Sequence, residues 1–301
     1  MSKVLVLGGT RFFGKKLVNL LIQEGSDVTV ATRGHTEDSF GDQVTRIRLD
    51  RTVPEQLRQA VGDTEWDVVY DNIGYHPQDA FHACEIFAGK VKRYIFTSTL
   101  SVYPFGQIGY SEEEFSPYTY AIPANLPQEI AYGEGKRLAE AVLFQHASFP
   151  VCAVRFPIVL GMDDYTKRLH FHIEHVQQGL PIGLPNPQAE MSYITSDEAA
   201  RFLFWLKNQH FEGPVNACSD GVLSIRQIIQ LIEEGAGKSA LIVDTSDPQQ
   251  AAAFDTAHLS PFGVPEQWGL DTSKAAQHGF KFDSIQDWYP QLITSIIGSR
   301  S

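Results

Sequence analysis

Apolar and polar positions follow two alternating patterns over the first half of the chain. Short apolar runs bounded by polar residues or glycine predict strands, and apolar residues at every third or fourth position predict the helices between them. Because strands that alternate with amphipathic helices form βαβ units, the pattern predicts an α/β fold with a Rossmann-type doubly wound parallel sheet. The strands are expected at residues 3–7, 27–31, 44–49, 67–70, 93–97 and 151–155, and the helices near residues 14–23, 54–61, 77–88 and 129–146.

The pattern loosens after Pro157, where a smaller α/β part is expected. RLHFHIEHVQQG predicts a helix ended by Gly179, and MSYITSDEAARFLFWLK predicts a short strand and then a helix capped by Ser196 or Asp197. Two more helices are expected, one from Ser224 and one over residues 284–297. We expect residues 1–160 to form a dinucleotide-binding domain to which residues 190–222 return. Residues 161–189 and 223–301 are expected to form a substrate-binding part that closes a cleft over the sheet.

A loop rich in Glu, Pro and Tyr separates the fifth expected strand from the helix that follows it, over about residues 106–126. Loops of this length in compact domains are often lids or binding loops. We therefore expect this loop to lie near the ligand.

Composition narrows the functional classes. Of the 301 residues, 43% are hydrophobic and 20% are charged, as in ordinary globular proteins, and no apolar run approaches the roughly 20 residues of a membrane span. The first apolar stretch is short and runs into a glycine turn, which favours a strand over a signal peptide. Three scattered cysteines suit a reducing cytoplasm, and a net charge of -12 argues against broad nucleic-acid binding. We predict a cytoplasmic protein with a small-molecule substrate.

The segment VLVLGGTRFFGKKLVNLLIQEG predicts a strand, a glycine turn and a helix, which is a dinucleotide-binding arrangement. Gly8 permits the tight turn and Gly14 lets the helix pack closely on the strand, while the helix N-terminus suits a pyrophosphate. Arg11 replaces the middle glycine of the usual fingerprint and offers a guanidinium to a phosphate. The alternative is a glycine turn without a ligand. The other expected contacts in this turn are Thr10, Phe12 and Phe13.

The end of the second strand indicates which dinucleotide is bound. NAD-specific sheets usually carry an acidic residue there, whereas this chain has Thr32 and Arg33. Because an arginine suits a 2′-phosphate, we predict that NADP is preferred over NAD. The alternative is that Arg33 is an ordinary solvated arginine. Asp50 is expected at the adenine edge, and Asn72 and Gly74 on the nicotinamide side.

Tyr132 and Lys136 lie four residues apart in YGEGK, which places both side chains on one face of a helix. An ammonium group beside a phenol favours the phenolate and lowers the pKa of the tyrosine from about 10. Such a tyrosine can take a proton from an alcohol or give one to a developing alkoxide. The pair predicts acid–base chemistry.

His170, His172 and His175 lie close together in HFHIEH. Helical zinc sites favour a separation of four residues, and the separations here are two, three and five. We expect no metal site and interpret these histidines as polar residues of the substrate-binding part.

Together these features resemble the short-chain dehydrogenase/reductase superfamily, in its extended branch of epimerase/dehydratase-like enzymes with a GGTRFxG turn. In that branch a Ser or Thr three residues before a Val-Tyr pair completes the catalytic group, and this pattern points to Thr99. The resemblance implies that Thr99 bonds the substrate oxygen, Tyr132 transfers its proton, and Lys136 bonds the nicotinamide ribose. Without the resemblance, a Thr99 hydroxyl bonded to backbone is an equal alternative. The similarity rests on GGTRFFG, YIFTSTLSVY, YGEGK followed by Glu140, VRFPIVLG, SYITSDEAA and LDTSKAAQHGFKF.

The same resemblance suggests further contacts and a homodimer paired through the helices over residues 77–88 and the one bearing YGEGK. Tyr165 and Phe171 are possible pocket residues, although aromatic residues at such positions are more often part of the core. The remaining expected cofactor contacts are Thr97 and Phe156, and the expected substrate contacts are Tyr75, Ser101, Tyr103 and Tyr193.

Three departures from the family pattern limit the chemistry. Sugar dehydratases of this branch carry Asp-Glu directly after the catalytic Thr, and this chain has Leu100 and Ser101, so dehydration is not expected. Nucleotide-sugar epimerases place an arginine where this chain has Met191, and no second clamp arginine follows between Phe254 and Leu270. We therefore predict a reductase or epimerase acting on a carbonyl or secondary alcohol, with a sugar derivative among the candidate substrates. The GGTR variant also resembles a sub-branch of chloroplast stem-loop RNA-binding proteins, so the alternative is a non-catalytic nucleotide-sensing or RNA-binding protein.

Overall fold

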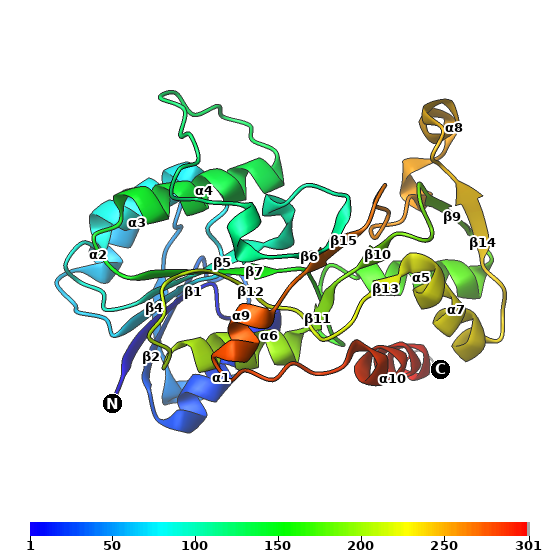
Figure 1. Ribbon diagram of the computed structural model, residues 1–301. Helices are drawn as coiled ribbons and strands as arrows, with labels where there is room; N and C mark the ends of the chain where they lie inside the picture. Colours follow the sequence, from blue (N-terminus) through cyan, green and yellow to red (C-terminus); the bar gives the residue numbers. More distant parts are fainter. Residues whose placement is uncertain (300–301) are drawn as a thin grey trace.

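Seven parallel strands form the central sheet of the computed structural model, which describes residues 1–299 (Figure 1). The strand order β12-β7-β5-β4-β1-β2-β3 reverses direction between β1 and β4, as in a doubly wound Rossmann-type sheet. The predicted fold class is therefore confirmed. The strands are β1 (Lys3–Leu7), β2 (Asp27–Thr32), β3 (Thr45–Arg48), β4 (Val68–Asp71), β5 (Tyr94–Thr99), β7 (Val151–Phe156) and β12 (Gly213–Asn216).

Helices cover both faces of this sheet and bury an apolar core on each (Figure 1). On one face lie α1 (Phe12–Glu24), α6 (Ser196–Leu206) and the short α9 (Ser273–Gln277). On the other lie α2 (Pro54–Val61), α3 (Pro77–Ile86) and α4 (Tyr132–His146). The central strands β4 and β7 are buried along their whole length because both of their faces are covered, whereas the edge strand β3 is mostly exposed.

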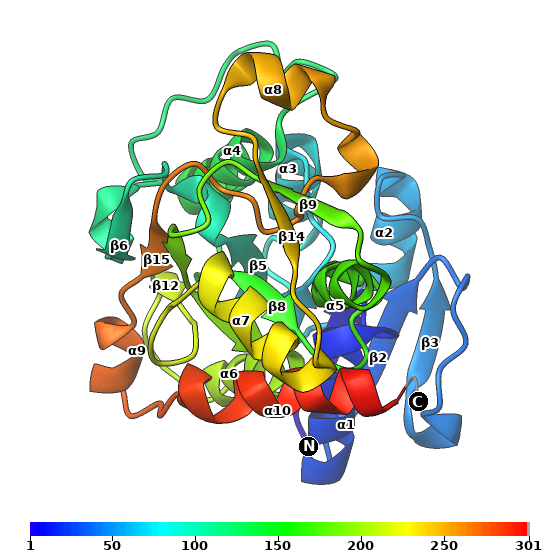
Figure 2. The same ribbon diagram turned by 90° about the vertical axis from the view of Figure 1, so that its right-hand side faces the viewer.

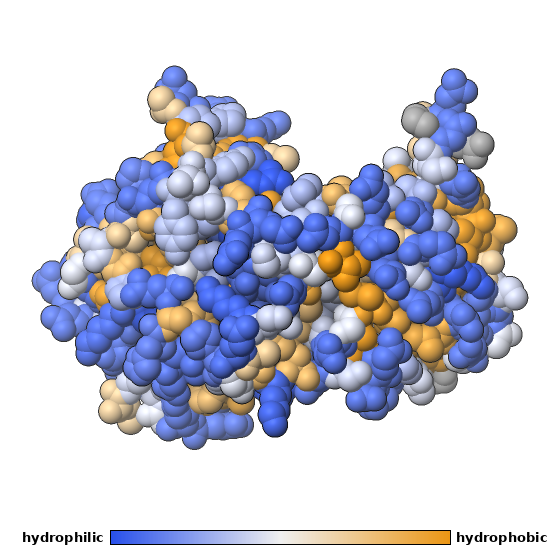
Figure 3. All heavy atoms as spheres, in the orientation of Figure 1, coloured by the Kyte–Doolittle hydropathy of each residue, from blue (hydrophilic) through white to orange (hydrophobic). Residues whose placement is uncertain are grey.

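A second group of elements packs at the carboxyl ends of the strands around its own apolar core. Figure 2 shows its helices α5 (Arg168–Gln178), α7 (Ile225–Ala236) and α10 (Ile285–Gly298) beside the parallel pair β9 (Pro181–Leu184) and β14 (Leu241–Asp244). The helix α8 (Pro248–Ala253) projects from this group, and the surface is hollowed between it and the loop that precedes α4 (Figure 3).

Small sheets join the two groups. A four-stranded sheet has the order β13 (Leu223–Ser224), β10 (Glu190–Met191), β15 (Trp268–Leu270) and β6 (Gln107–Tyr110), and β8 (Ile158–Leu160) pairs with β11 (Tyr193–Thr195). Among the described residues there are also four short 3-10 helices, η1 (Gly41–Gln43), η2 (Leu100–Val102), η3 (Glu112–Glu114) and η4 (Thr256–His258).

Element boundaries agree with the sequence pattern in several places and differ in others. The expected strand 3–7 and helix 54–61 are confirmed at both ends, and Ser224 is the N-cap of α7 as expected. The helix expected from residue 129 begins at Tyr132, because Ala131 before it has a non-helical ψ of 142°. Thr195, rather than Ser196 or Asp197, caps α6 by accepting a hydrogen bond from the Glu198 amide. The loop expected at 106–126 contains β6 and η3.

Candidate functional site

The candidate site lies where β1, β4 and β5 end, next to the N-termini of α1 and α4, which is where doubly wound sheets bind ligands. Gly8 follows β1 with a φ of +79°, in the left-handed region that favours glycine. A side-chain carbon at Gly14 would come within 2.8 Å of the Gly8 carbonyl oxygen, so only glycine lets α1 approach the turn. Arg11 has extended backbone angles open to any residue, and replacing the middle glycine therefore causes no strain there.

The N-terminus of α1 fits an anionic ligand. Its first turn carries no acidic residue, and no side chain caps it. The exposed amides and the positive end of the helix dipole therefore remain available to a phosphate. The Arg11 guanidinium lies beside this end, where its Nε donates to the Thr36 hydroxyl at 2.8 Å.

A cavity of about 430 Å³ adjoins this turn along β2 and β3. Arg33, directly after β2, is exposed at the same edge as Asp50. The pKa of the Asp50 carboxyl is lowered, chiefly by hydrogen bonds from Thr52 and further by the charges of Arg33 and His35. The structure thus brings together the two residues expected around the adenosine end. The cavity is lined by Thr10, Val30, Thr32, Gly34, Thr36, Glu37, Asp38, Arg46, Ile47 and Arg48.

On the opposite side of the turn, Asn72 and Thr97 are bonded to each other. The Asn72 amide nitrogen donates to the Gly8 carbonyl at 3.2 Å, and its oxygen accepts from the Thr97 hydroxyl at 2.8 Å. Both residues were expected to contact the cofactor. In the structure they also tie the ends of β4 and β5 to the glycine turn.

Thr99 and Tyr132 meet at the end of β5. The Thr99 hydroxyl accepts from the Ser101 amide at 3.1 Å and donates to the Ser101 hydroxyl at 3.3 Å. It also lies close enough to the Tyr132 phenol to lower the pKa of that group, and Tyr132 is 54% exposed. Gly133 permits this approach, because a side-chain carbon there would lie 2.5 Å from the Ser101 carbonyl oxygen.

Lys136 lies one turn along α4 and is 1% exposed. Its ammonium group donates to the Gly74 carbonyl at 2.7 Å and to the Thr97 carbonyl at 2.6 Å. It also faces the rings of Tyr75 and Phe96, with centroids at 4.7 and 4.6 Å. Burial lowers the pKa of Lys136 to about 7, because desolvation disfavours the cation.

The electrostatics of Tyr132 differ from the expectation drawn from its spacing to Lys136. Burial raises the pKa of Tyr132, while the Thr99 hydrogen bond and the charge of Arg168 oppose the rise. Lys136 instead turns its ammonium toward the Gly74 and Thr97 carbonyls. The predicted lowering of the Tyr132 pKa by Lys136 is therefore wrong for this structure. The helical spacing fixes a shared face but not the direction of a long side chain.

Several aromatic residues expected at the site lie elsewhere. Tyr193 is fully buried and packs edge-on against Phe262 and Tyr289 in the core of the second group of elements. Tyr103 is also buried, and Phe156 lies in the core beside α1. These three were expected to contact ligands, and in this structure their side chains are packed in cores. An apolar ring in a core and one in a pocket carry the same sequence signal.

Other expected aromatic residues remain at the surface of the site. Tyr75 is half-exposed, with its ring centroid 6.3 Å from that of Tyr132. Tyr165 is exposed, and its ring lies edge-on to Phe12 and 5.7 Å from the Arg11 guanidinium. Phe13 packs inward, and Phe171 packs against the His175 ring.

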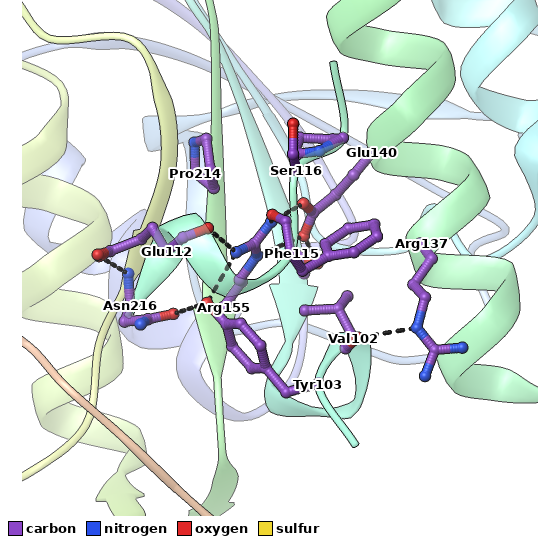
Figure 4. Close-up of polar contacts among 12 residues, drawn as sticks. Val102, Tyr103, Glu112, Phe115, Ser116, Arg137, Glu140, Arg155, Pro214 and Asn216 are labelled. Atoms are coloured by element: carbon purple, nitrogen blue, oxygen red, sulfur yellow. Dashed lines mark hydrogen bonds and ion pairs between the residues drawn. The ribbon is translucent and has the colours of Figure 1, made fainter. Parts of the chain in front are cut away.

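The sequence reasoning missed the role of a buried ion pair beneath α4 (Figure 4). Arg155 and Glu140 are both fully buried, and the guanidinium donates to the two carboxylate oxygens at 2.6 and 3.1 Å. The hydroxyl of Ser98, the residue directly before Thr99, also donates to this carboxylate. A signal was present, because Glu140 continues the Tyr132–Lys136 face at a spacing of four within an apolar stretch.

Arg155 extends the network into neighbouring segments. It donates to the Tyr103 hydroxyl at 2.7 Å and to the carbonyls of Glu112 and Phe115, both at 3.0 Å (Figure 4). Tyr103 in turn donates to Asn216 on β12 at 2.9 Å. The pair thus joins α4, β5, β7, β12 and the segment around η3.

The expected histidine group is held by local hydrogen bonds. The two ring nitrogens of His172 contact the Ser260 hydroxyl at 2.7 Å and the Arg168 carbonyl at 2.9 Å. Burial lowers the pKa of His172 to about 3, and the ring of His175 contacts His258 at 3.0 Å. Within residues 1–299, no three His, Cys, Asp or Glu side chains are grouped to hold a metal ion. Over the same residues, no helix has the length and apolar character needed to cross a membrane.

Comparisons with known proteins bear on the family and the fold of this chain. The sequence model of the NAD dependent epimerase/dehydratase family matches residues 4–80, which span the glycine turn through the start of α3. The chloroplast stem-loop binding protein of 41 kDa b of Arabidopsis thaliana is 26% identical over 224 residues, which are 69% of this chain. The chain spans 56% of the length of that relative.

Solved structures with the same fold cover almost the whole chain. UDP-glucose 4-epimerase of Thermotoga maritima, solved with UDP-glucose, is 15% identical with a TM-score of 0.74 over 99% of this chain and 100% of its own. The dTDP-glucose 4,6-dehydratase of Bacillus anthracis, solved with NAD, is 13% identical with a TM-score of 0.76 over 100% of this chain and 98% of its own. The enzyme WbmH of Bordetella bronchiseptica, solved with NAD+, is 16% identical with a TM-score of 0.72 over 99% of this chain and 98% of its own.

Proposed function

We propose that this chain, an extended short-chain dehydrogenase/reductase by its fold with an N-terminal segment of the NAD dependent epimerase/dehydratase family, is a dinucleotide-dependent reductase or epimerase. Its substrate is a carbonyl compound or a secondary alcohol. The observation that carries the proposal is the proximity of Thr99 and Tyr132 at the carboxyl edge of the sheet, with Lys136 one turn further on.

The residues at this edge fit a dinucleotide. Gly8 and Gly14 leave room for close approach to the turn, and the first turn of α1 offers uncapped amides to a pyrophosphate. When bound, the nicotinamide would supply or accept a hydride. Asn72, Gly74 and Thr97 are the groups of this chain placed toward that end of the site.

Each residue of the candidate catalytic group has a distinct task. Thr99 orients the substrate oxygen, because its hydroxyl is already fixed by the Ser101 amide. Tyr132 gives a proton to that oxygen during reduction or takes it during oxidation, and the residue as a whole is 54% exposed. Lys136 is anchored by two backbone carbonyls and holds a donor beneath the bound ligand.

Replacing Tyr132 with phenylalanine tests the proposal. The variant keeps the ring and loses only the hydroxyl, so turnover should fall by about 10²–10⁴ as expected for lost acid–base catalysis, while dinucleotide binding persists. Substrates are screened by nicotinamide absorbance for reduction and by product stereochemistry for epimerisation. Turnover equal to that of the wild-type protein would remove Tyr132 from the mechanism.

The preferred cofactor is NADP in this proposal. Arg33 stands exposed after β2 where NAD-specific sheets carry an acid, and Arg46 and Arg48 line the adjoining cavity. Dissociation constants of the two cofactors decide the matter, and tighter binding of NAD would refute the preference.

The division into a dinucleotide-binding domain and a substrate-binding part, the homodimer and the cytoplasmic location remain predictions. Sedimentation showing a monomer at micromolar concentration would remove the homodimer.

In this proposal the substrate is not held by the arginines that bind the diphosphate in nucleotide-sugar epimerases. Met191 occupies the position of the first clamp arginine and is buried in the core of the second group of elements. A nucleotide-sugar would therefore need other anchors in this chain.

A second candidate function follows from the matched chloroplast stem-loop binding protein. On this alternative the scaffold binds structured RNA without turnover. The net charge of -12 opposes it, because RNA binding depends on a basic face. Filter binding with a structured RNA separates the two functions, since tight and salt-sensitive retention would favour the RNA-binding protein.

A further inference from the structure

A buried arginine lies at the end of the sheet behind the candidate site. Arg51, between β3 and α2, is 4% exposed and Asp71, the last residue of β4, is 1% exposed. Arg51 pairs with Asp71 at 2.6 Å and with Asp79 of α3 at 3.3 Å, and the Tyr94 hydroxyl donates to Asp71 at 2.7 Å. We refer to Arg51, Asp71, Asp79 and Tyr94 as the Arg51 cluster.

The Arg51 cluster is poorly suited to a purely stabilising role. The Nε and Nη1 atoms of Arg51 are buried and make no hydrogen bond to any residue in 1–299. Desolvation of such a pair offsets much of its Coulomb attraction, so a buried and partly satisfied ion cluster is weak support for stability. Its position relative to the site therefore calls for another explanation.

Gly74 connects the cluster to Lys136. A side-chain carbon at Gly74 would lie 2.8 Å from Asp71 Oδ2 and 2.9 Å from Arg51 Nη1, so this backbone rests directly on the pair. Asp71 also accepts from the Ile73 amide at 3.2 Å, which fixes the turn leading to Gly74. The Gly74 carbonyl then accepts from the Lys136 ammonium at 2.7 Å.

The cluster also sets the charge around Lys136. The charged groups that act on its ammonium are Asp71, Arg51 and Asp79 of the cluster and Glu140 of α4. Glu140 is neutralised by its pair with Arg155. The cluster has one carboxylate more than its single arginine can balance, so it presents a net negative charge behind the ammonium.

We propose that the Arg51 cluster is a positioning device for Lys136. It fixes the Gly74 carbonyl that receives the ammonium, and its excess carboxylate favours the cationic form of Lys136 against the desolvation of the site. Arg51 limits this effect and holds both carboxylates in place. The consequence for turnover rests on the proposed function, whereas the ionisation of Lys136 can be measured independently of any reaction.

Nuclear magnetic resonance of the full chain with ¹³C-labelled lysine tests the proposal. The Lys136 signal is assigned by its loss in Lys136→Met and titrated in the wild-type protein, where a midpoint of about 7 is expected. In Asp71→Asn the midpoint should fall by about 1–3 pH units, because removing a nearby opposite charge disfavours the cation. The matched control is Asp67→Asn, which removes the same charge just before β4, where Asp67 pairs with Lys92 at 2.7 Å. The control should leave the midpoint unchanged.

A second variant covers the case in which Asp71→Asn does not fold. Asp79→Asn removes the other carboxylate of the cluster, which also favours the cationic form of Lys136, so the midpoint should again fall, by less than in Asp71→Asn because Asp79 acts more weakly on the ammonium. Circular dichroism verifies the fold of each variant. A Lys136 midpoint in either folded variant equal to that of the Asp67→Asn control would overturn the proposal. A shifted midpoint in a protein with no dinucleotide-dependent activity would uphold the cluster's role and remove the proposed function instead.

Discussion

Replacing Glu140 with glutamine removes the charge of a fully buried carboxylate and leaves its shape. The structure assigns that carboxylate two charge-assisted hydrogen bonds from Arg155, at 2.6 and 3.1 Å, and one from Ser98. Arg155 would then remain buried as an uncompensated cation, with only neutral oxygen acceptors around it. Breaking a buried pair in this way costs about 3–5 kcal/mol of unfolding free energy. For a chain of this size the melting temperature should fall by roughly 5–15 °C.

Urea unfolding followed by circular dichroism measures this change against a control on the same helix. Glu134 pairs with Arg137 at the partly exposed surface of α4, and Glu134→Gln should cost under about 1 kcal/mol, as surface pairs do. Replacing Glu140 and Arg155 together by apolar residues removes the uncompensated charge but should restore only part of the loss, because the buried groups that Arg155 and Glu140 bond would lose their partners. A loss in Glu140→Gln no larger than that in Glu134→Gln would refute the reasoning.

Three other predictions concern single residues. Arg33→Ala should weaken NADP binding by roughly tenfold or more and leave NAD binding nearly unchanged, because only the 2′-phosphate contact is lost; equal losses measured by calorimetry would exclude that contact. Gly133→Ala should lower both turnover and stability, since the added carbon would lie 2.5 Å from the Ser101 carbonyl oxygen; a melt and an activity unchanged from wild type would show that α4 shifts freely. The pKa of His172 is lowered to about 3 in the folded protein, so as the pH falls below about 6.5 the unfolded chain takes up a proton at this residue before the folded protein does, and the wild-type protein loses stability. The His172→Gln variant lacks this loss, so the gap in unfolding free energy between wild type and variant, measured in urea, should be about 2 kcal/mol smaller at pH 5 than at pH 7. A gap that is the same at both pH values would contradict the buried neutral ring.

The parallel sheet was predictable because its signal is local. Apolar strands buried on both faces and amphipathic helices each carry a period that residues 1–160 show directly. Outside that alternation the sequence predicted the short strand before α6, which is β11, but not the others. β12 and β15 are four and three residues long, and they pair with partners distant in the sequence. A strand of three or four residues that is fixed by pairing with a distant segment is too short to show a periodic pattern of apolar residues in the sequence.

The candidate site was predictable in its composition and less so in its geometry. Spacing placed Tyr132 and Lys136 on one face of α4, and the resemblance pointed to Thr99 at the end of β5. The direction of the Lys136 side chain depends on two carbonyls from β5 and the turn after β4, which no local pattern reveals. Tyr103 was expected in the pocket, but its hydroxyl is hydrogen-bonded to Arg155 and Asn216, which lie on β7 and β12.

The face of α4 that carries the candidate chemistry is held by two buried ion clusters. The pair of Glu140 with Arg155 fixes α4 against β5 and β7 one turn beyond Lys136. The Arg51 cluster fixes the Gly74 carbonyl on the other side of the same ammonium. Apolar residues in place of the Arg51 cluster would pack at similar cost to stability, but they would leave the ammonium without a compensating charge. The charged groups of the Arg51 cluster are therefore better explained by the demands of Lys136 than by those of the core, whereas the pair of Glu140 with Arg155 holds α4 in place.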